Sequence, residues 1–178
     1  MRNGEADMRR SIRLMTLAAA VAVTAPLGLA SSTGSAVADG PVGAGRGGTF
    51  VPLNQVLRRC DYGGTEFNGP TGYARATSVI RSTGSGVSAD VEMNTAIPNM
   101  RYDVRLIQAP RPSAATCHGG DPGVAAGVLQ INGAGYGSVT LHDAVEPGAT
   151  GAWVFITRPD AFSQNPAEFY TSDWIEDI

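Results

Sequence analysis

Apolar and polar side chains alternate along much of this chain, and that period of two constrains the fold more than any other feature. Across residues 87–93 the odd-numbered positions are apolar and the even-numbered positions are polar: Val87, Ser88, Ala89, Asp90, Val91, Glu92 and Met93. Residues 101–106 repeat the pattern in the opposite phase. Successive side chains of a β-strand point to opposite faces, so each segment is predicted to be a strand with one buried and one solvated face.

Turn residues divide the rest of the chain into further short segments of the same kind. The additional predicted strands are residues 73–82, 124–131, 138–142 and 152–157, the last of them deeply buried. The glycine-containing segments 83–86 and 132–137 are predicted to close two hairpins, because glycine adopts positive φ without steric cost. About six to eight strands suffice for two packed sheets, so we predict an all-β, antiparallel β-sandwich of the immunoglobulin-like kind.

One short helical turn is predicted near the C-terminus. Asn165 is a capping residue, Pro166 suits the first helical position, and Glu168 supplies an acid in the first turn. The following segment, 169–178, carries three aromatic residues, which is too much apolar surface for a free tail. We expect it to pack against the domain.

An export signal is predicted at the N-terminus. Three arginines precede an uncharged run over residues 14–30: Arg9, Arg10 and Arg13. A small-residue cleavage site follows at 36–38. An apolar run of about 17 residues is also compatible with a short membrane span, which needs roughly 20, but its alanine-rich composition favours cleavage. Residues 1–38 are therefore predicted to be a cleaved signal peptide, which leaves a secreted or otherwise extracytoplasmic protein with no membrane attachment.

Two details of this N-terminal segment stay open. Arg9 and Arg10 are compatible with twin-arginine export as well as with the general secretory route. Translation is compatible with a start at Met1 or at Met8, because the residues between them add two acids to a region that is normally basic.

A glycine-rich leader over residues 39–48 is predicted to be flexible, and a single domain is predicted over residues 49–178. Residues 39–178 contain nine arginines, fourteen acidic residues and no lysine, which gives a net charge of −5. Nucleic acids and anionic membranes select clustered positive charge, so neither is the predicted partner. The main basic residues are interpreted as parts of solvated strand faces: Arg58, Arg59, Arg101, Arg105 and Arg111.

Cys60 and Cys117 are the only cysteines, and they enclose 58 residues, counting both ends. In an oxidising compartment such a pair is expected to form one disulfide, which stabilises by about 4 kcal/mol in the chain-entropy model. A redox pair would use a CxxC spacing, which the sequence lacks. A zinc site would need ligands beyond the cysteines, His118 and Asp121. We therefore predict a disulfide, and neither a metal nor another cofactor.

Residues 97–106 resemble the tyrosine corner of fibronectin type III and related immunoglobulin-like domains. Pro98 precedes Tyr102 by four residues, and in those domains the tyrosine hydroxyl bonds back to the preceding backbone. At least three predicted strands follow this stretch, whereas the fibronectin order leaves one. The resemblance therefore implies the architecture and not the topology.

Most of the predicted mature chain resembles small conserved exported proteins of mycobacteria and related actinobacteria. The shared features are a signal peptide, a glycine-rich leader, the segment 102–106, a cysteine in the loop after it, and a late hairpin containing Gly135. This resemblance implies location and fold, and it carries no assigned activity.

Residues suited to catalysis are few. His142 is followed by Asp143, yet adjacent strand residues point to opposite faces, so the acid is badly placed to orient the imidazole. His118 follows Cys117, whose thiol the predicted disulfide consumes. The sequence contains no GxSxG motif for a serine nucleophile.

These observations predict a non-catalytic binding or surface-interaction module of unknown ligand, with a protein or a cell-envelope component as the expected kind of partner. The long loop over residues 109–123 is the predicted contact region, and Arg111, His118 and Asp121 are its polar residues. The alternative is a small secreted hydrolase that uses His142 or His118.

Overall fold

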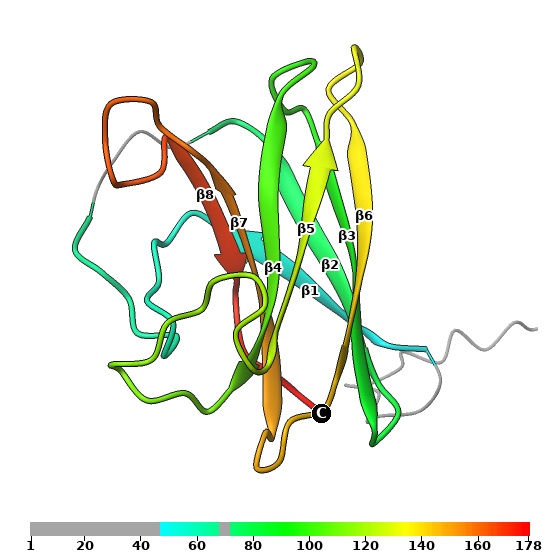
Figure 1. Cartoon of the computed structure of the whole chain (residues 1–178). Coiled ribbons are helices and arrows are strands. Elements are labelled where there is room, and N and C mark those ends of the chain that lie inside the picture. The colour runs from blue at the N-terminus through cyan, green and yellow to red at the C-terminus, as the bar shows by residue number, and fades with distance from the viewer. Residues whose placement is uncertain (1–46, 68–71) are drawn as a thin grey trace, which may run out of the picture. The chain divides into compact units, whose positions relative to one another are not determined.

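Nine β-strands, and no helix, are present in the residues that the computed structural model describes, 47–67 and 72–178 (Figure 1). In chain order they are β1 (Thr49–Asn54), β2 (Arg75–Ser82), β3 (Gly86–Asn94), β4 (Arg101–Ala109), β5 (Val124–Gln130), β6 (Gly137–Ala144), β7 (Gly151–Arg158), β8 (Glu168–Ser172) and β9 (Glu176–Asp177). The predicted signal peptide and positions 39–46 of the predicted leader lie outside the described residues. Within the described part, no helix is long and apolar enough to cross a membrane.

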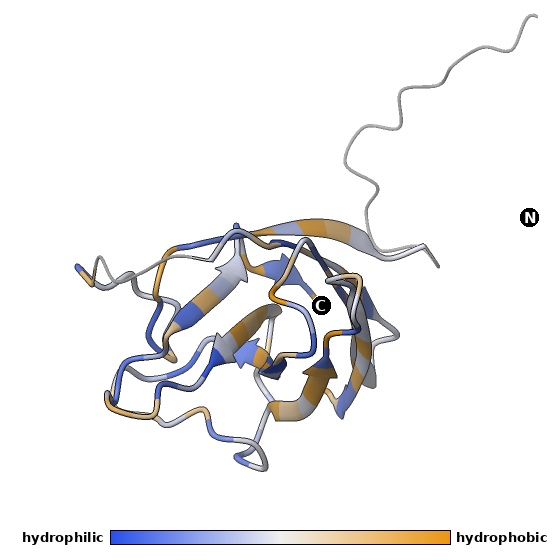
Figure 2. Ribbon diagram, turned by 90° about the horizontal axis from the view of Figure 1, so that it is seen from above, coloured by the Kyte–Doolittle hydropathy of each residue, from blue (hydrophilic) through white to orange (hydrophobic). Residues whose placement is uncertain are grey.

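All neighbouring strands pair antiparallel, in the order β5-β4-β7-β8-β1-β2-β3-β6, and β9 adds to β7. β1 connects two halves of this path, because residues 49–52 pair with β2 whereas Leu53 and Asn54 pair with β8. The end strands β5 and β6 approach each other closely at Gly127, where a Cβ atom would lie 2.6 Å from Leu141 Cδ2. The sheet is therefore nearly closed, and from above its strands surround the core (Figure 2).

The all-β, antiparallel part of the predicted fold is confirmed, and each strand predicted from alternation is present. An immunoglobulin-like sandwich is not confirmed, because the strands follow one another along a single, nearly closed path. The hairpin predicted around 83–86 is confirmed by the pairing of β2 with β3. The hairpin predicted around 132–137 is wrong as a paired unit, since β5 pairs with β4 and β6 pairs with β3.

The predicted helical turn near the C-terminus is wrong. The Ala167 amide donates to the Arg158 carbonyl, and Glu168 begins β8 opposite Arg158. The Glu168 carboxylate is buried, where it accepts hydrogen bonds from the Tyr102 hydroxyl and from Arg158 Nε. Strand pairing and the burial of this carboxylate override the local capping signal. The expected packing of residues 169–178 is confirmed, because β8 is buried throughout and β9 pairs with β7.

The inner core lies inside the nearly closed sheet and is formed by the apolar positions of the alternating strands. Its buried residues are Val51, Ala76, Ile80, Val87, Ala89, Val91, Met93, Ala96, Tyr102, Val104, Leu106, Leu129, Ile131, Leu141, Ala152, Val154, Ile156 and Tyr170. The polar positions of β3 face outward, where Asp90 binds Arg81 and Thr140. The faces assigned from the alternation of residues 87–93 are therefore confirmed.

A second group of buried side chains, the outer cluster, lies on the outside of β4, β7 and β8. It consists of Ile107, Ala109, Cys117, Val124, Trp153, Phe155 and Phe169. The Trp153 ring meets Tyr62 edge-on, with centroids 5.2 Å apart, and stacks on Phe155 with centroids 5.7 Å apart. Two loops contribute to this cluster: the Cys60 loop, residues 55–67, and the Cys117 loop, residues 110–123. β7 is therefore buried on both faces, as its continuous apolar run predicted.

Candidate functional site

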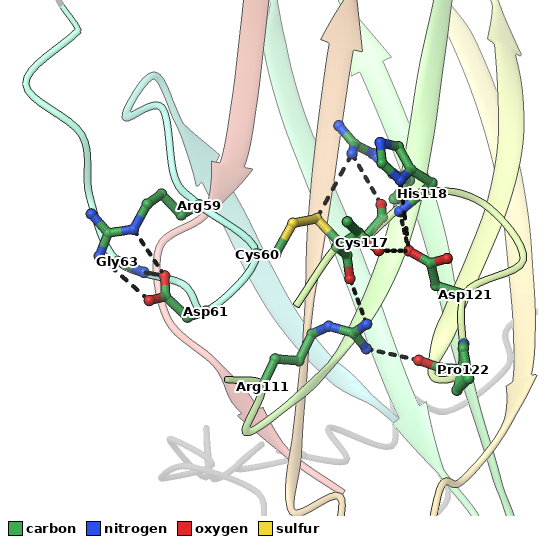
Figure 3. The surroundings of a disulfide bond; sticks show 11 residues. Arg59, Cys60, Asp61, Gly63, Arg111, Cys117, His118, Asp121 and Pro122 are labelled. Carbon is green, nitrogen blue, oxygen red and sulfur yellow. Dashed lines mark hydrogen bonds and ion pairs between the residues drawn. A yellow bond between two sulfur atoms is a disulfide. The ribbon is translucent and has the colours of Figure 1, made fainter. Parts of the chain in front are cut away.

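The disulfide between Cys60 and Cys117 joins the two loops that contribute to the outer cluster (Figure 3). The predicted pairing is thus confirmed, with the two Cα atoms 5.5 Å apart. Both cysteines also contact the apolar side chains of the outer cluster. The bond therefore fixes the Cys60 loop beside the Cys117 loop on the outside of the sheet.

Hydrogen bonds within the Cys117 loop engage the side chains of two of its three predicted contact residues (Figure 3). Arg111 donates from Nη1 to the Pro122 carbonyl, at 2.8 Å, and from Nη2 to the Thr116 carbonyl, at 2.6 Å. Asp121 Oδ2 accepts from the Thr116 hydroxyl at 2.7 Å and from the His118 amide at 2.8 Å. These bonds, that from Thr116 first, hold the pKa of Asp121 below its usual value. Arg111 and Asp121 therefore shape the loop.

His118, the third predicted contact residue, presents its imidazole to solvent. Its side chain is 79% exposed, and Nδ1 lies 3.8 Å from Asp121 Oδ2. The residue lines a surface cavity of about 450 Å³, the His118 cavity, whose lining also includes Arg101, Asp103 and Arg105. The structure thus places His118, but neither Arg111 nor Asp121, in this cavity.

Arg105, which the sequence suggested was part of a solvated strand face, is half-buried on the outside of β4. It lies opposite Phe155 in the β4–β7 ladder, and its guanidinium carbon is 4.3 Å from the centre of that ring. Nη1 donates to the Cys117 carbonyl at 3.1 Å. Burial lowers the pKa of Arg105 from its usual value, because the charged form loses hydration. The solvated interpretation of Arg105 is therefore wrong.

Arg58 occupies a comparable setting in the Cys60 loop. Its guanidinium carbon lies 4.0 Å from the centre of the Tyr62 ring, and its Nη1 donates to the Tyr62 carbonyl at 3.3 Å. Its Nε atom is buried and has no hydrogen-bond partner among residues 47–67 and 72–178. Arg58, like Arg105, is therefore a cation that packs on an aromatic ring and has N–H donors without a hydrogen-bond partner in the described residues.

Both arginines line one surface cavity of about 380 Å³, the arginine cleft, between the Cys60 loop, β4, β7 and the segment after β7. Its lining consists of Leu57, Arg58, Thr65, Arg105, Phe155, Thr157, Pro159, Asp160, Ser163, Gln164, Asn165 and Pro166. The His118 cavity shares Arg105 and Thr157 with this cleft, so the two cavities flank Arg105. A cavity of about 300 to 1,000 Å³ is the usual size of a small-molecule site.

The arginine cleft carries a local excess of positive charge on an acidic protein. The arginines that form ion pairs in the described residues are others: Arg59 with Asp61, Arg81 with Asp90, Arg101 with Asp103, and Arg158 with Glu168. Two cations therefore line the cleft without a carboxylate partner in that part of the chain. One acid, Asp160, shares the lining, and its Oδ1 accepts a hydrogen bond from the Phe162 amide at 2.7 Å.

The histidine proposed as a catalytic base stands apart from both cavities. His142 is exposed on β6, opposite Ser88 in the register, and lines neither the arginine cleft nor the His118 cavity. Asp143 turns to the other face, where Oδ2 accepts a hydrogen bond from Gln108 Nε2 at 2.9 Å. The predicted separation of His142 from the neighbouring acid is therefore confirmed. Among the residues described, no three His, Cys, Asp or Glu side chains gather as a metal site would require.

Tyr102 forms a different contact from that of a tyrosine corner. Its hydroxyl donates to the Glu168 carboxylate on β8, and not to the backbone near Pro98. Burial, and then the bond to Glu168, raise the pKa of Tyr102. The residue therefore ties β4 to β8 inside the sheet.

The sequence contained one signal that the outer face of β4 is covered. The run Trp153 to Ile156 has apolar residues at consecutive positions, which is typical of a strand buried on both faces. The strand that pairs with this run must then have its outer face covered as well, and Arg105 lies on that face beneath a loop.

Comparisons with protein-family models, with curated proteins and with solved structures yield no match.

Proposed function

We propose that this protein is a secreted, non-catalytic binding module and that the arginine cleft is its ligand site. The observation that carries the proposal is a cavity of about 380 Å³ lined by apolar side chains and by two guanidinium groups that form no ion pair among the described residues. Polar groups converging in a largely apolar pocket are characteristic of sites that bind small molecules. The expected partner is a small molecule, or a protein or cell-envelope component that inserts one group into the cleft.

The cleft is built to be present before a ligand arrives. β4 and β7 supply its floor, and they pair with each other along seven registered positions. The disulfide fixes the Cys60 loop, which supplies Leu57, Arg58 and Thr65 at one side. A preformed site loses less conformational entropy when it binds a ligand.

The extracytoplasmic location belongs to the same proposal. A disulfide that contacts a buried cluster supports it, because such bonds persist in oxidising compartments. The arginines and the apolar run at the N-terminus of the sequence support it independently. The immunoglobulin-like resemblance and the resemblance to exported actinobacterial proteins enter here as further proposals about fold class and origin.

The proposal is tested with the exported protein recovered from the medium of an expressing host. A library of small fragments is screened by ligand-observed NMR against the wild type and against Thr157→Phe, which fills the cleft. Thr77→Phe on β2 is the matched control, since Thr77 is also half-buried and lies outside the cleft. We expect fragments that bind the wild type and Thr77→Phe but not Thr157→Phe.

Two results would contradict the proposal. One is a screen in which no fragment distinguishes Thr157→Phe from the wild type. The other is hydrolysis of ester, peptide or glycoside substrates that His142→Ala or His118→Ala abolishes. That second result would instead establish the hydrolase alternative.

A further inference from the structure

Two guanidinium groups from separate parts of the chain line the arginine cleft, and both are held in place by the protein. Each packs against one aromatic ring, Tyr62 for Arg58 and Phe155 for Arg105. Each also donates one hydrogen bond to a backbone carbonyl, that of Tyr62 for Arg58 and that of Cys117 for Arg105. Because rings and carbonyls restrict both side chains, little ordering is left for a ligand to impose.

Donors remain unused on both groups. Nε and Nη2 of Arg105 have no hydrogen-bond partner within the described segments. Nε of Arg58 is buried and also has no partner there. A buried donor without an acceptor costs free energy, and a partly buried cation without a counter-ion costs more. An anion in the cleft would supply a counter-ion for both guanidinium groups and an acceptor for the remaining donors of Arg105.

The rest of the lining indicates the kind of molecule that carries the anion. Leu57, Pro159 and Pro166 present apolar surface, whereas Gln164 and Asn165 are polar but uncharged. A free inorganic ion would leave this apolar surface without a contact. An organic acid with a compact apolar body would use both parts of the cleft.

We propose that the arginine cleft binds the oxyanion of a small organic acid, a carboxylate or a phosphate monoester, with its apolar body against Leu57, Pro159 and Pro166. The assignment rests on the proposed binding function and specifies its ligand class. Guanidinium groups suit such oxyanions because their N–H donors lie in one plane and pair with two oxygens. The two arginines thus provide a charge-selective end, and the apolar residues provide the opposite wall.

The test is calorimetric titration of the exported protein with four probes: benzoate, phenyl phosphate, benzamide and inorganic phosphate. We expect benzoate or phenyl phosphate to bind at least roughly tenfold more tightly than neutral benzamide, as charge-assisted hydrogen bonds would give. We expect inorganic phosphate to bind more weakly than phenyl phosphate. Benzamide binding as tightly as both anions would overturn the oxyanion assignment. Inorganic phosphate equal to phenyl phosphate would overturn the role of the apolar wall.

Variants connect the binding to the two arginines. Arg58→Gln and Arg105→Gln are each expected to weaken binding of the preferred anion by roughly 10- to 100-fold. Arg75→Gln is the matched control, because Arg75 is exposed on β2 and lies outside the cleft. Arg105→Lys keeps the charge but not the paired donors, so its affinity should lie between those of the wild type and Arg105→Gln. Unchanged affinity in Arg58→Gln and Arg105→Gln would contradict the proposal.

Gln164→Glu provides a test that does not depend on removing either arginine. Gln164 is exposed in the cleft lining, and the change adds a carboxylate of nearly the same shape. We expect a higher melting temperature and at least roughly tenfold weaker binding of the anion, because the new carboxylate competes for the same cations. Unchanged anion binding in a folded Gln164→Glu variant would overturn the assignment.

The two proposals fail in distinguishable ways. If neutral fragments occupy the cleft while benzoate and phenyl phosphate show no preference, the oxyanion assignment fails and the binding module stands. If neither fragments nor anions distinguish Thr157→Phe from the wild type, both proposals fail.

Discussion

The inner core and the outer cluster lie on opposite faces of the same two strands, β4 and β7, yet they are closed by different means. Leu106 and Ile107 are neighbours on β4 and both are fully buried, the first in the inner core and the second in the outer cluster. The strands of a nearly closed sheet surround the inner core. Two loops joined by one disulfide complete the outer cluster.

This difference between the two regions explains why the candidate ligand site lies beside the outer cluster. Polar groups of the inner core satisfy one another, as Tyr102, Glu168 and Arg158 do through a buried hydrogen bond and an ion pair. At the margin of the outer cluster, Arg58 and Arg105 line a cavity and have donors without a hydrogen-bond partner in the described part of the chain. A face covered by loops can leave such groups for a ligand, whereas a closed sheet interior cannot.

The largest expected effect comes from removing the disulfide. Cys60→Ser combined with Cys117→Ser should cost about 4 kcal/mol in the free energy of unfolding, from the greater entropy of the unfolded chain. Amide hydrogen exchange should rise most in the Cys60 and Cys117 loops and least in β3. Equal acceleration in β3 and in the loops would mean that the outer cluster is not an independently closed region.

Paired truncations on β4 measure the two regions directly. Leu106→Ala and Ile107→Ala should each cost about 3 kcal/mol in urea denaturation of the oxidised protein. In the variant without cysteines, the cost of Ile107→Ala should shrink because the loops over it are already loosened, while that of Leu106→Ala should persist. Equal costs of both changes in both backgrounds would contradict this contrast.

Glu168→Gln examines the polar network at the margin of the inner core. The change leaves Arg158 without its carboxylate, and the Arg158 side chain is only 25% exposed. We expect a loss of about 2 kcal/mol in chemical denaturation, since breaking one partner of a buried pair strands the other charge. Asp103→Asn, which removes the partner of the more exposed Arg101, is the control and should cost about 0.5 kcal/mol or less.

Alkaline pH gives the smallest expected effect, a gradual loss of stability as buried tyrosines ionise. Burial also raises the pKa of Tyr62 beside the outer cluster, so both regions contribute to this loss. Burial raises the pKa of Tyr170 to about 12 from a usual 10.0, and burial likewise raises the pKa of Tyr102. The unfolded chain therefore loses these protons first, so stability is complete below pH 10 and falls as the pH rises toward about 12. Tyr102 and Tyr170 belong to the inner core, so their ionisation should lower the free energy of unfolding of that core within this range.

Denaturant midpoints measured between pH 10 and 12 check this, with Tyr170→Phe as the variant. Its stability should decline less steeply than that of the wild type, because one raised pKa is removed. Tyr136→Phe is the control, since Tyr136 is 38% exposed on the segment before β6, and its decline should match the wild type. A wild-type slope retained in Tyr170→Phe would contradict the assignment.

A segment could be predicted from the sequence when neighbouring residues determine its structure, and could not when distant segments do. Residues 87–93 and 101–106 were predicted as strands because alternation is read from adjacent positions, and β3 and β4 contain both segments. Residues 165–168 were predicted wrongly because their capping signal is also local, whereas Glu168 is held by partners on β4 and β7. Long-range pairing decided that segment, and no pattern within it reveals the pairing.

The sequence by itself determined the strands β2 to β7, the buried face of each alternating segment and the pairing of its only two cysteines. It could do so because side-chain alternation is a local property and two cysteines allow one intramolecular bond. Only the tertiary structure decided the near closure of the sheet, the second buried face of β4, and the convergence of Arg58 and Arg105 on one cleft. Those features depend on which distant segments meet, and burial beside an aromatic ring changes what an arginine can do.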